Sequence, residues 1–459
     1  MNMPYVDGQS TVAATEQREL FRSAAVLGRS KPRTGGRRRT YSHAGTAEVA
    51  APGNGRAPRG MEALSDALLD KHLIPSQFPL DAKRAQDTMA KFLIGFLSIW
   101  GALHLYVFWR LWSIPWIAGH VSALVLIITG VALWLSYVVA RILDQKGLQA
   151  LIWPIEYFAA NWIGLLFLMF WALLAVDLFT LGGRLLHAQA PTIRGWAVLI
   201  AVLLSVVALV QAIRPPVVTD YEVELAGLPG EGDGTVLLQL SDLHLGNLLG
   251  RSWLTKLVRQ VNGLKADIVV ITGDLVDGNV GRVEPLREVL EELRAPLGVW
   301  AVTGNHEYYA GLERSIRLLE NAGFQVLRDG ARQAAPGLII AGVDDLTARQ
   351  QLGAENHALD KALSNRPNGG TVLLSHSPWQ AESAAASGAG LMLSGHTHNG
   401  QVWPFNYFVR MRYPLVAGKY EVNGMTAIVS RGTGTWGPRM RLWRPSEIVR
   451  ITLKTLNQK

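Results

Sequence analysis

Five short polar motifs in the second half of the chain contain side chains of the kinds that bind metal ions. They are residues 241–244 (SDLH), 273–277 (GDLVD), 304–307 (GNHE), 375–377 (SHS) and 395–398 (GHTH). These motifs hold five of the eleven histidines of the chain, which has no cysteine. Imidazole, carboxylate and amide ligands without a thiolate suit manganese, iron or zinc. Each motif supplies only one or two ligands, so the five together predict a site for two divalent ions.

The motifs follow or lie among apolar segments of strand length, which predicts that strands carry them. The expected strands are residues 235–240, 268–272, 299–303, 338–343, 371–374, 391–393, 427–430 and 448–453. Amphipathic segments at 254–264, 283–293 and 315–322 predict helices between several of these strands. Such alternation is typical of an α/β fold, here a layered β-sandwich flanked by helices. Its site is expected at the carboxyl ends of the strands.

Spacing within the motifs predicts how the ligands reach the site. Asp242 and His244 are two residues apart, so on an extended strand end both side chains point to the same face. Residues 396–398 repeat this spacing. Gly273 and Gly304 each precede a potential ligand, and glycine allows the backbone to turn tightly there.

The motifs resemble those of the calcineurin-like metallophosphoesterase superfamily, whose pattern is D-x-H, G-D-x-x-D, G-N-H-[DE], a lone H and G-H-x-H. All five blocks are present in that order, and no ligand is replaced. The resemblance covers about residues 217–455. The closing stretches 430–437 (SRGTGTWG) and 445–448 (PSEI) are similar to the membrane-attached, bacterial-type branch. The resemblance therefore implies a metallophosphoesterase domain that is attached to a membrane.

The resemblance implies a role for each ligand of a dinuclear metal centre. The first metal would be held by Asp242, His244 and His398, the second by Asn305, His376 and His396, with Asp274 bridging both. The two divalent ions, of manganese, iron or zinc, would supply a bridging hydroxide as the nucleophile and stabilise the phosphoryl group. His306 and Asp277 would be the catalytic side chains: His306 would protonate the leaving group, and Asp277 would orient its ring.

The implied reaction is hydrolysis of a phosphomonoester, phosphodiester or pyrophosphate bond. Serine/threonine protein phosphatases of the superfamily have a phosphate-binding arginine after the second aspartate of their motif, where this chain has Gly278. A protein-phosphatase role is therefore not expected. Glu307 completes the third motif and is expected behind the ligands at most. The alternative function is a membrane transport or sensory protein whose metal domain binds a phosphorylated ligand without turnover.

The region at residues 92–213 contains four apolar stretches, each about 18–25 residues long, the length that crosses a bilayer as helix. They are approximately residues 92–112, 116–140, 157–181 and 196–213. Tryptophan and tyrosine collect near their ends, as in the aromatic belts of membrane proteins. The pattern predicts four transmembrane helices. Asp177, inside the third stretch, is a functional candidate or a side chain that reaches the headgroups.

The distribution of charged residues along the chain indicates which partners are expected and how the protein is oriented in the membrane. Residues 1–60 predict a disordered basic tail, and residues 61–91 predict an amphipathic juxtamembrane segment. The net charge is +8, but residues 215–459 hold 24 basic and 24 acidic residues, so no nucleic-acid partner is expected. The positive-inside rule predicts a multi-pass protein of the cell (inner) membrane, with the catalytic domain in the cytoplasm if the number of spans is even.

An aromatic cluster flanks the last ligand motif in the sequence. Its members are Trp403, Phe405, Tyr407, Phe408, Trp436 and Trp443. Two interpretations stand side by side. The cluster is either part of the core and rim of the domain, or an apolar lip that admits a lipid-linked phosphoester from the bilayer.

Overall fold

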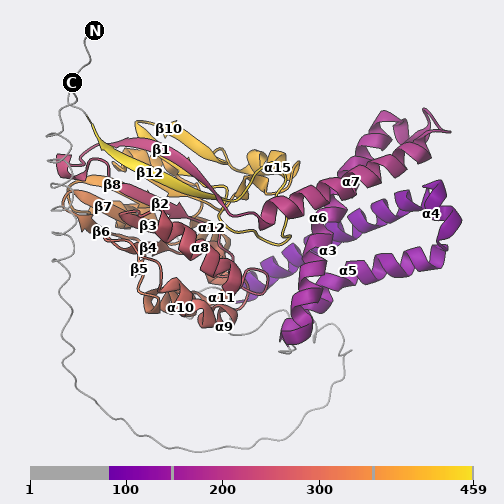
Figure 1. Ribbon diagram of the computed structural model, residues 1–459, viewed down its shortest axis with the longest axis horizontal. Helices are drawn as coiled ribbons and strands as arrows, with labels where there is room; N and C mark the ends of the chain where they lie inside the picture. The colour runs from indigo at the N-terminus through magenta and orange to yellow at the C-terminus, as the bar shows by residue number, and fades with distance from the viewer. Residues whose placement is uncertain (1–81, 146–148, 354–356, 457–459) are drawn as a thin grey trace, which may run out of the picture.

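The computed structural model describes residues 82–145, 149–353 and 357–456. In these ranges the chain forms a bundle of long helices followed by an α/β domain (Figure 1). The predicted tail over residues 1–60 lies outside the described residues, as does the predicted juxtamembrane segment as far as residue 81. Residues 82–91 form the start of the first described helix.

The bundle contains three helices that are long and apolar enough to cross a membrane. Its helices are α3 (Ala82–Trp112), α4 (Pro115–His120), α5 (Ala123–Gln145), α6 (Gln149–Phe179) and α7 (Ala190–Ile213). The candidate spans, judged by length and composition, are Ala123–Ala140, Trp153–Phe179 and Ala190–Ile213. The prediction of four transmembrane helices is therefore corrected to three candidate spans in the described part of the chain.

The difference arises in the first two predicted stretches. Some side chains of residues 92–112 lie outside the described set, and the described end of α3 carries the polar residues His104 and Arg110. The predicted stretch 116–140 is divided, because the backbone is extended at Val121 between α4 and α5. Helix α3 nevertheless lies beside the candidate spans in the bundle (Figure 1).

The α/β domain is built on two six-stranded sheets that pack face to face. The first has the order β1 (Val217–Leu225), β12 (Glu447–Thr455), β2 (Val236–Leu240), β3 (Ile268–Thr272), β4 (Val299–Val302) and β5 (Gln325–Val326). The second has the order β10 (Gly418–Val422), β11 (Met425–Val429), β9 (Leu391–Ser394), β8 (Gly370–Leu374), β7 (Leu338–Gly342) and β6 (Gly330–Ala335). Neighbouring strands from β2 to β5 are parallel, as are β7, β8, β9 and β11.

Apolar side chains on the inner faces of the sheets form the central core. Leu237, Val270 and Trp300 of the first sheet belong to one buried cluster with Val372 and Leu393 of the second. Helices cover the outer faces: α8 (Arg251–Gly263), α9 (Val280–Val283), α10 (Arg287–Leu290) and α11 (Asn305–Asn321) on the first sheet, and α12 (Leu346–Gln351), α13 (Ala358–Ser364) and α14 (Ala381–Ala386) on the second. The predicted layered α/β architecture is present in the described residues.

One helix of the domain, α15 (Phe405–Arg412), lies apart from these layers and beside the bundle (Figure 1). Its Phe405 ring contacts Phe167 of α6, with 5.9 Å between the ring centroids. The bundle and the domain are therefore in direct contact next to the last ligand motif.

Candidate metal centre

The five motifs converge at one end of the sandwich, each directly after a strand. Asp242 and His244 follow β2, Asp274 follows β3, Asn305 follows β4, His376 follows β8, and His396 and His398 follow β9. Strands β2, β3 and β4 are parallel neighbours, as are β8 and β9, so their carboxyl ends meet at a common edge of each sheet. The site lies between these two edges, as the strand pattern predicts.

The side chains form two groups that a third group, His244, Asp274 and His306, connects. One group is Asp242, His244 and His398, the other Asp274, His376 and His396, and in each the ligand atoms lie within 4.8 Å of one another. The Asp274 Oδ2 atom is 3.1 Å from His376 Nε2 and 3.8 Å from His244 Nε2. Asp274 is thus within reach of both groups, which is the position that a bridging ligand requires.

The ring nitrogens face one another across short distances. His244 Nε2 is 3.1 Å from His398 Nε2, and His376 Nε2 is 3.1 Å from His396 Nδ1. His376 Nε2 is also 3.2 Å from Asn305 Oδ1, while its Nδ1 donates to the Thr272 carbonyl at 2.8 Å. Lone pairs that point toward one place favour a proton or a cation there. The nitrogen and oxygen donors fit divalent ions of manganese, iron or zinc without choosing among them.

Burial sets the protonation of most of the histidines. Desolvation lowers the pKa of His244 to about 4 and that of His396 to about 3, and it holds the pKa of His398 well below its usual value. These rings are therefore neutral at pH 7, the form that binds metal. Burial alone would raise the pKa of Asp274, but the charges of His376 and His306 outweigh it and hold that pKa well below the usual range.

The ligand loops have an unusual backbone. Five predicted ligands have φ between 47° and 69°: Asp242, His244, Asp274, His396 and His398. Such left-handed conformations are uncommon for residues other than glycine and cluster at functional sites. The expectation of an extended strand end at Asp242 and His244 is therefore wrong, although both side chains do reach the site. Tight turns aim them, and hydrogen bonds such as His396 N to Asp242 Oδ1, at 3.0 Å, hold the turns in place.

Glu307 ties two ligand loops together from behind. The side chain is buried, and its carboxylate accepts hydrogen bonds from the backbone N–H groups of Asp274 (2.9 Å), Val276 (2.9 Å) and Gly304 (2.7 Å). At Gly304 a Cβ atom would lie 2.2 Å from Asp274 Oδ1, so only glycine permits this close approach. The sequence pattern placed Glu307 behind the ligands, but it gave no sign of these three bonds.

His306 lies beside the two groups and is paired with a carboxylate. Its Nδ1 is 3.0 Å from Asp277 Oδ1, and its backbone N–H donates to Asp274 Oδ1 at 2.8 Å. Burial would lower its pKa, but the charge of Asp274 and the bond to Asp277 prevail and raise the pKa to about 9. The ring is therefore protonated at neutral pH and able to donate a proton. Tyr309 and Trp436 flank it, at 5.5 and 5.8 Å between centroids.

Two further residues contact the ligands and were not predicted. The Tyr413 hydroxyl is 2.7 Å from His396 Nε2. The buried Arg441 guanidinium lies 3.4 Å from His398 Nδ1 and donates to the Gly434 carbonyl at 2.6 Å. Both residues lie outside the motifs, so no local spacing in the sequence pointed to them.

Comparison with known proteins decides the family. A sequence profile described as calcineurin-like phosphoesterase matches residues 235–400. An uncharacterized metallophosphoesterase of Aquifex aeolicus is 37% identical over 242 residues, which are 52% of this chain and 91% of that protein. The chain belongs to the calcineurin-like metallophosphoesterases. The resemblance predicted from the motifs is thus confirmed.

The metallophosphoesterase also resembles proteins that are named as transmembrane proteins. A Danio rerio protein named transmembrane protein with metallophosphoesterase domain is 38% identical over 271 residues, covering 56% of this chain and 62% of that protein. The chain thus spans less than two thirds of this relative. The solved structure of a Danio rerio dimetal phosphatase aligns with 14% identity and a TM-score of 0.29, over 44% of this chain and 88% of that one, a likeness too weak to support an argument. The apolar helices and the named relatives together indicate membrane association.

Proposed function

We propose that this metallophosphoesterase is a membrane-attached hydrolase that uses two divalent ions to cleave a phosphomonoester, phosphodiester or pyrophosphate bond. The observation that supports this most is the position of Asp274 between the two ligand groups. Asp242, His244 and His398 would hold one ion, and Asn305, His376 and His396 the other, with Asp274 shared. Two ions bound there would polarise the phosphoryl group and acidify a water molecule.

The remaining side chains supply proton transfer and orientation. His306 is the general acid in this proposal, because it is protonated at neutral pH and lies next to both ligand groups. Its proton would pass to the leaving oxygen as the bond to phosphorus breaks. Asp277 would keep the ring in place through the 3.0 Å contact with Nδ1.

The substrate is proposed to be lipid-linked. All six aromatic residues that flank the last ligand motif are more than two-fifths exposed, from 42% at Trp403 to 55% at Tyr407 and Trp443. This favours an apolar lip over core packing. Trp436 contacts the His306 ring, so the exposed aromatic surface extends to the proposed general acid.

The catalytic domain is proposed to face the cytoplasm from the inner membrane. Arg214 follows the end of α7 that leads directly into β1, so it lies on the domain side of the bundle. At the opposite end of the bundle Arg110 and Arg194 are paired with Asp177. If the number of spans is even, the positive-inside rule supports this orientation, because the basic tail and Arg214 then lie on the same side of the membrane.

The test is metal-dependent hydrolysis by the full-length protein. The protein is stripped with a chelator, manganese is restored, and turnover of bis-p-nitrophenyl phosphate is followed. We expect turnover to depend on the metal and to be abolished in Asp274→Asn, while the thermal melt of the variant still shows a folded protein. Undiminished activity in folded Asp274→Asn would refute the bridging role.

A second candidate is a transport or sensory protein that binds a phosphorylated ligand without turnover. The observation that favours it is the buried Asp177, which contacts Arg110 of α3 and Arg194 of α7 inside the bundle. Ionisable residues buried among membrane helices are often functional. A flux assay in liposomes separates the two: ligand transport without hydrolysis supports the second candidate, and hydrolysis without transport supports the first.

A further inference from the structure

A cleft separate from the metal-binding groups lies where the catalytic domain contacts the bundle. Its volume is about 260 Å³, and it opens between α15 and the segment at residues 442–444. Its lining includes Trp403, Asn406, Tyr407, Arg410, Trp443 and Arg444. None of these residues belongs to the five metal-binding motifs. Trp403, Tyr407 and Trp443 are part of the proposed apolar lip, but the proposed function gives no role to Asn406, Arg410 or Arg444.

The cleft combines positive charge with a buried hydrogen-bond acceptor. Arg410 and Arg444 are exposed, and in the part of the chain that the structure describes neither forms an ion pair. Arg412, on the same helix, instead stacks on the Trp379 ring at 4.3 Å. Asn406 is only 8% exposed, and its Oδ1 has no hydrogen-bond partner among the described residues. A buried amide oxygen without a partner is costly, so a donor from a ligand would stabilise it.

Contacts with the bundle place the cleft at the level of the membrane. On α15, the Phe408 ring contacts the Trp171 ring, with 5.6 Å between the ring centroids, and Trp171 lies inside the candidate span Trp153–Phe179. The Trp443 backbone N–H donates to Gln211 Oε1 at 3.0 Å, close to the end of the span Ala190–Ile213. If these spans cross a bilayer, the cleft lies where the headgroups are. Tryptophan and tyrosine favour that layer.

We infer that this cleft binds the headgroup of an anionic phospholipid. Arg410 and Arg444 would contact the phosphate, and Asn406 Oδ1 would accept a hydrogen bond from a hydroxyl of the headgroup. Charge selects an anionic over a zwitterionic lipid, and the unpartnered acceptor selects a headgroup that carries hydroxyls. Phosphatidylglycerol has both properties and is the probe. The inference requires membrane association but not hydrolysis, so it stands or falls independently of the proposed function.

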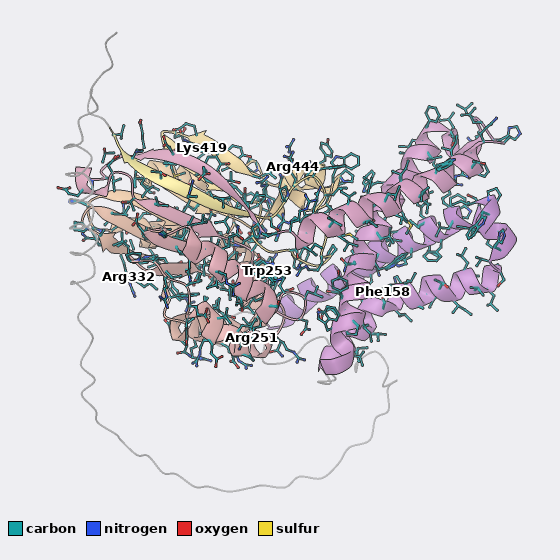
Figure 2. All side chains as sticks on the ribbon, viewed as in Figure 1. Phe158, Arg251, Trp253, Arg332, Lys419 and Arg444 are labelled. Atoms are coloured by element: carbon teal, nitrogen blue, oxygen red, sulfur yellow. The ribbon has the colours of Figure 1, made fainter. Side chains whose placement is uncertain are left out.

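The first experiment measures lipid binding to the full-length protein in an uncharged detergent. Short-chain phosphatidylglycerol is titrated against the wild type, the double variant Arg410→Gln/Arg444→Gln and the charge-matched control Arg294→Gln/Arg332→Gln. Arg332 lies at the far end of the catalytic domain from Arg444 (Figure 2). An arginine near a lipid phosphate contributes about 1 kcal/mol to binding. Loss of both arginines is therefore expected to weaken binding of phosphatidylglycerol about 30-fold. The control is expected to bind as the wild type does.

Competitors distinguish a lipid from a soluble phosphate. Phosphatidylcholine is expected to compete poorly, and glycerol phosphate to compete much more weakly than the lipid. Equal binding of both lipids would overturn the inference, as would equal losses in the two double variants. Full competition by glycerol phosphate would show a site for free phosphoesters instead of a lipid site.

A second experiment tests the depth of α15 directly. The chain has no cysteine, so a single introduced cysteine can carry a spin label without background. Met411 is 85% exposed at the end of α15, which makes Met411→Cys the reporter and Arg332→Cys the control. In phosphatidylglycerol vesicles the label at 411 should be accessible to oxygen and shielded from a water-soluble nickel complex, the reverse of the label at 332. A label at 411 with the same accessibility as the label at 332 would overturn the membrane placement.

Discussion

The histidines of the centre fall into two protonation classes because their charged neighbours differ. His244 and His396 are buried, and the neighbouring positive imidazoles His306 and His376 add to desolvation, so the neutral form is favoured. His306 is buried too, but two carboxylates contact it, Asp277 through its ring and Asp274 through its backbone, and the charged form is favoured. Carboxylates a few ångströms away therefore favour the charged form of His306, and they raise the pKa of the proposed ligand His376 in the same way.

The general-acid assignment predicts a dependence on the leaving group. In His306→Ala, we expect hydrolysis of an alkyl phosphoester to fall about 10²–10⁴-fold, since the alkoxide must be protonated as it leaves. Hydrolysis of a p-nitrophenyl ester should fall much less, because nitrophenolate leaves without a proton. Steady-state rates of the metal-loaded protein on both substrates provide the measurement. Equal losses on the two esters would exclude His306 as the acid.

The buried Glu307 predicts an effect on metal affinity. Glu307→Gln replaces one acceptor oxygen by a donor that faces the N–H groups of Asp274, Val276 or Gly304. Loss of such support behind metal ligands typically weakens metal affinity about 10–100-fold. Calorimetric titration with manganese measures the change. Glu320→Gln, at an exposed position on the same helix, is the control and should bind as the wild type does.

At the scale of secondary structure, an ion cluster joins three helices of the bundle. Asp177 of α6 accepts from Tyr106 Oη at 2.6 Å and from Arg194 Nε at 3.1 Å, and Arg110 Nε lies 2.5 Å from it. The side chain is buried, so the alternative that it extends into the headgroups is wrong for this structure. Among apolar helices, the cluster fixes which faces of α3, α6 and α7 meet.

This cluster predicts a large loss of stability when the charge is removed. Asp177→Asn leaves the buried Arg194 and the partly buried Arg110 without a counter-charge, and breaking a buried pair typically costs about 3–5 kcal/mol. Thermal unfolding in detergent measures the loss. Asp220→Asn breaks an exposed pair with Arg450 and should cost at most about 1 kcal/mol. If Asp177→Asn and Asp220→Asn unfold at the same temperature, the ion cluster around Asp177 does not stabilise the bundle.

At the scale of the whole molecule, the bundle and the domain share one hydrophobic core. Met440 and Leu442 of the domain are buried in the same cluster as Leu166 and Leu173 of α6. The backbone N–H of Arg441, whose side chain contacts His398, donates to the Ala208 carbonyl of α7. The metal centre is thus connected to a candidate membrane span by a single residue.

The shared core predicts that the two parts unfold together. Met440→Ser removes a buried side chain at the contact and should destabilise the full-length protein by about 2–5 kcal/mol. Chemical unfolding in detergent, followed by limited trypsin digestion, measures the change and locates it. Met411→Ser, at a position that is 85% exposed, is the matched control and should leave stability unchanged. A normal stability in Met440→Ser would show that the domain folds independently of the bundle.

Much of the fold follows from local patterns. All eight predicted strands are present, because each is a short, buried apolar run, and five of them end at a ligand motif. Strands β1, β5, β6 and β10 were not predicted, because they are half-exposed or very short and lack that signal. The second predicted span is shorter than expected, because composition does not reveal the break at Val121 between α4 and α5, and the first, residues 92–112, is not among the candidate spans of the described residues.

The sequence by itself determined the family and predicted the types and order of the candidate ligands, since these depend on the identity of residues within short motifs. Only the tertiary structure showed that Asp274 lies between two groups, that the ligands stand in left-handed turns, and that Glu307 joins two loops. It alone brought Arg441 to His398 and the cleft of Arg410 and Arg444 to the membrane helices. Contacts between residues far apart in the chain depend on how the sheets and helices pack, and no local spacing encodes them.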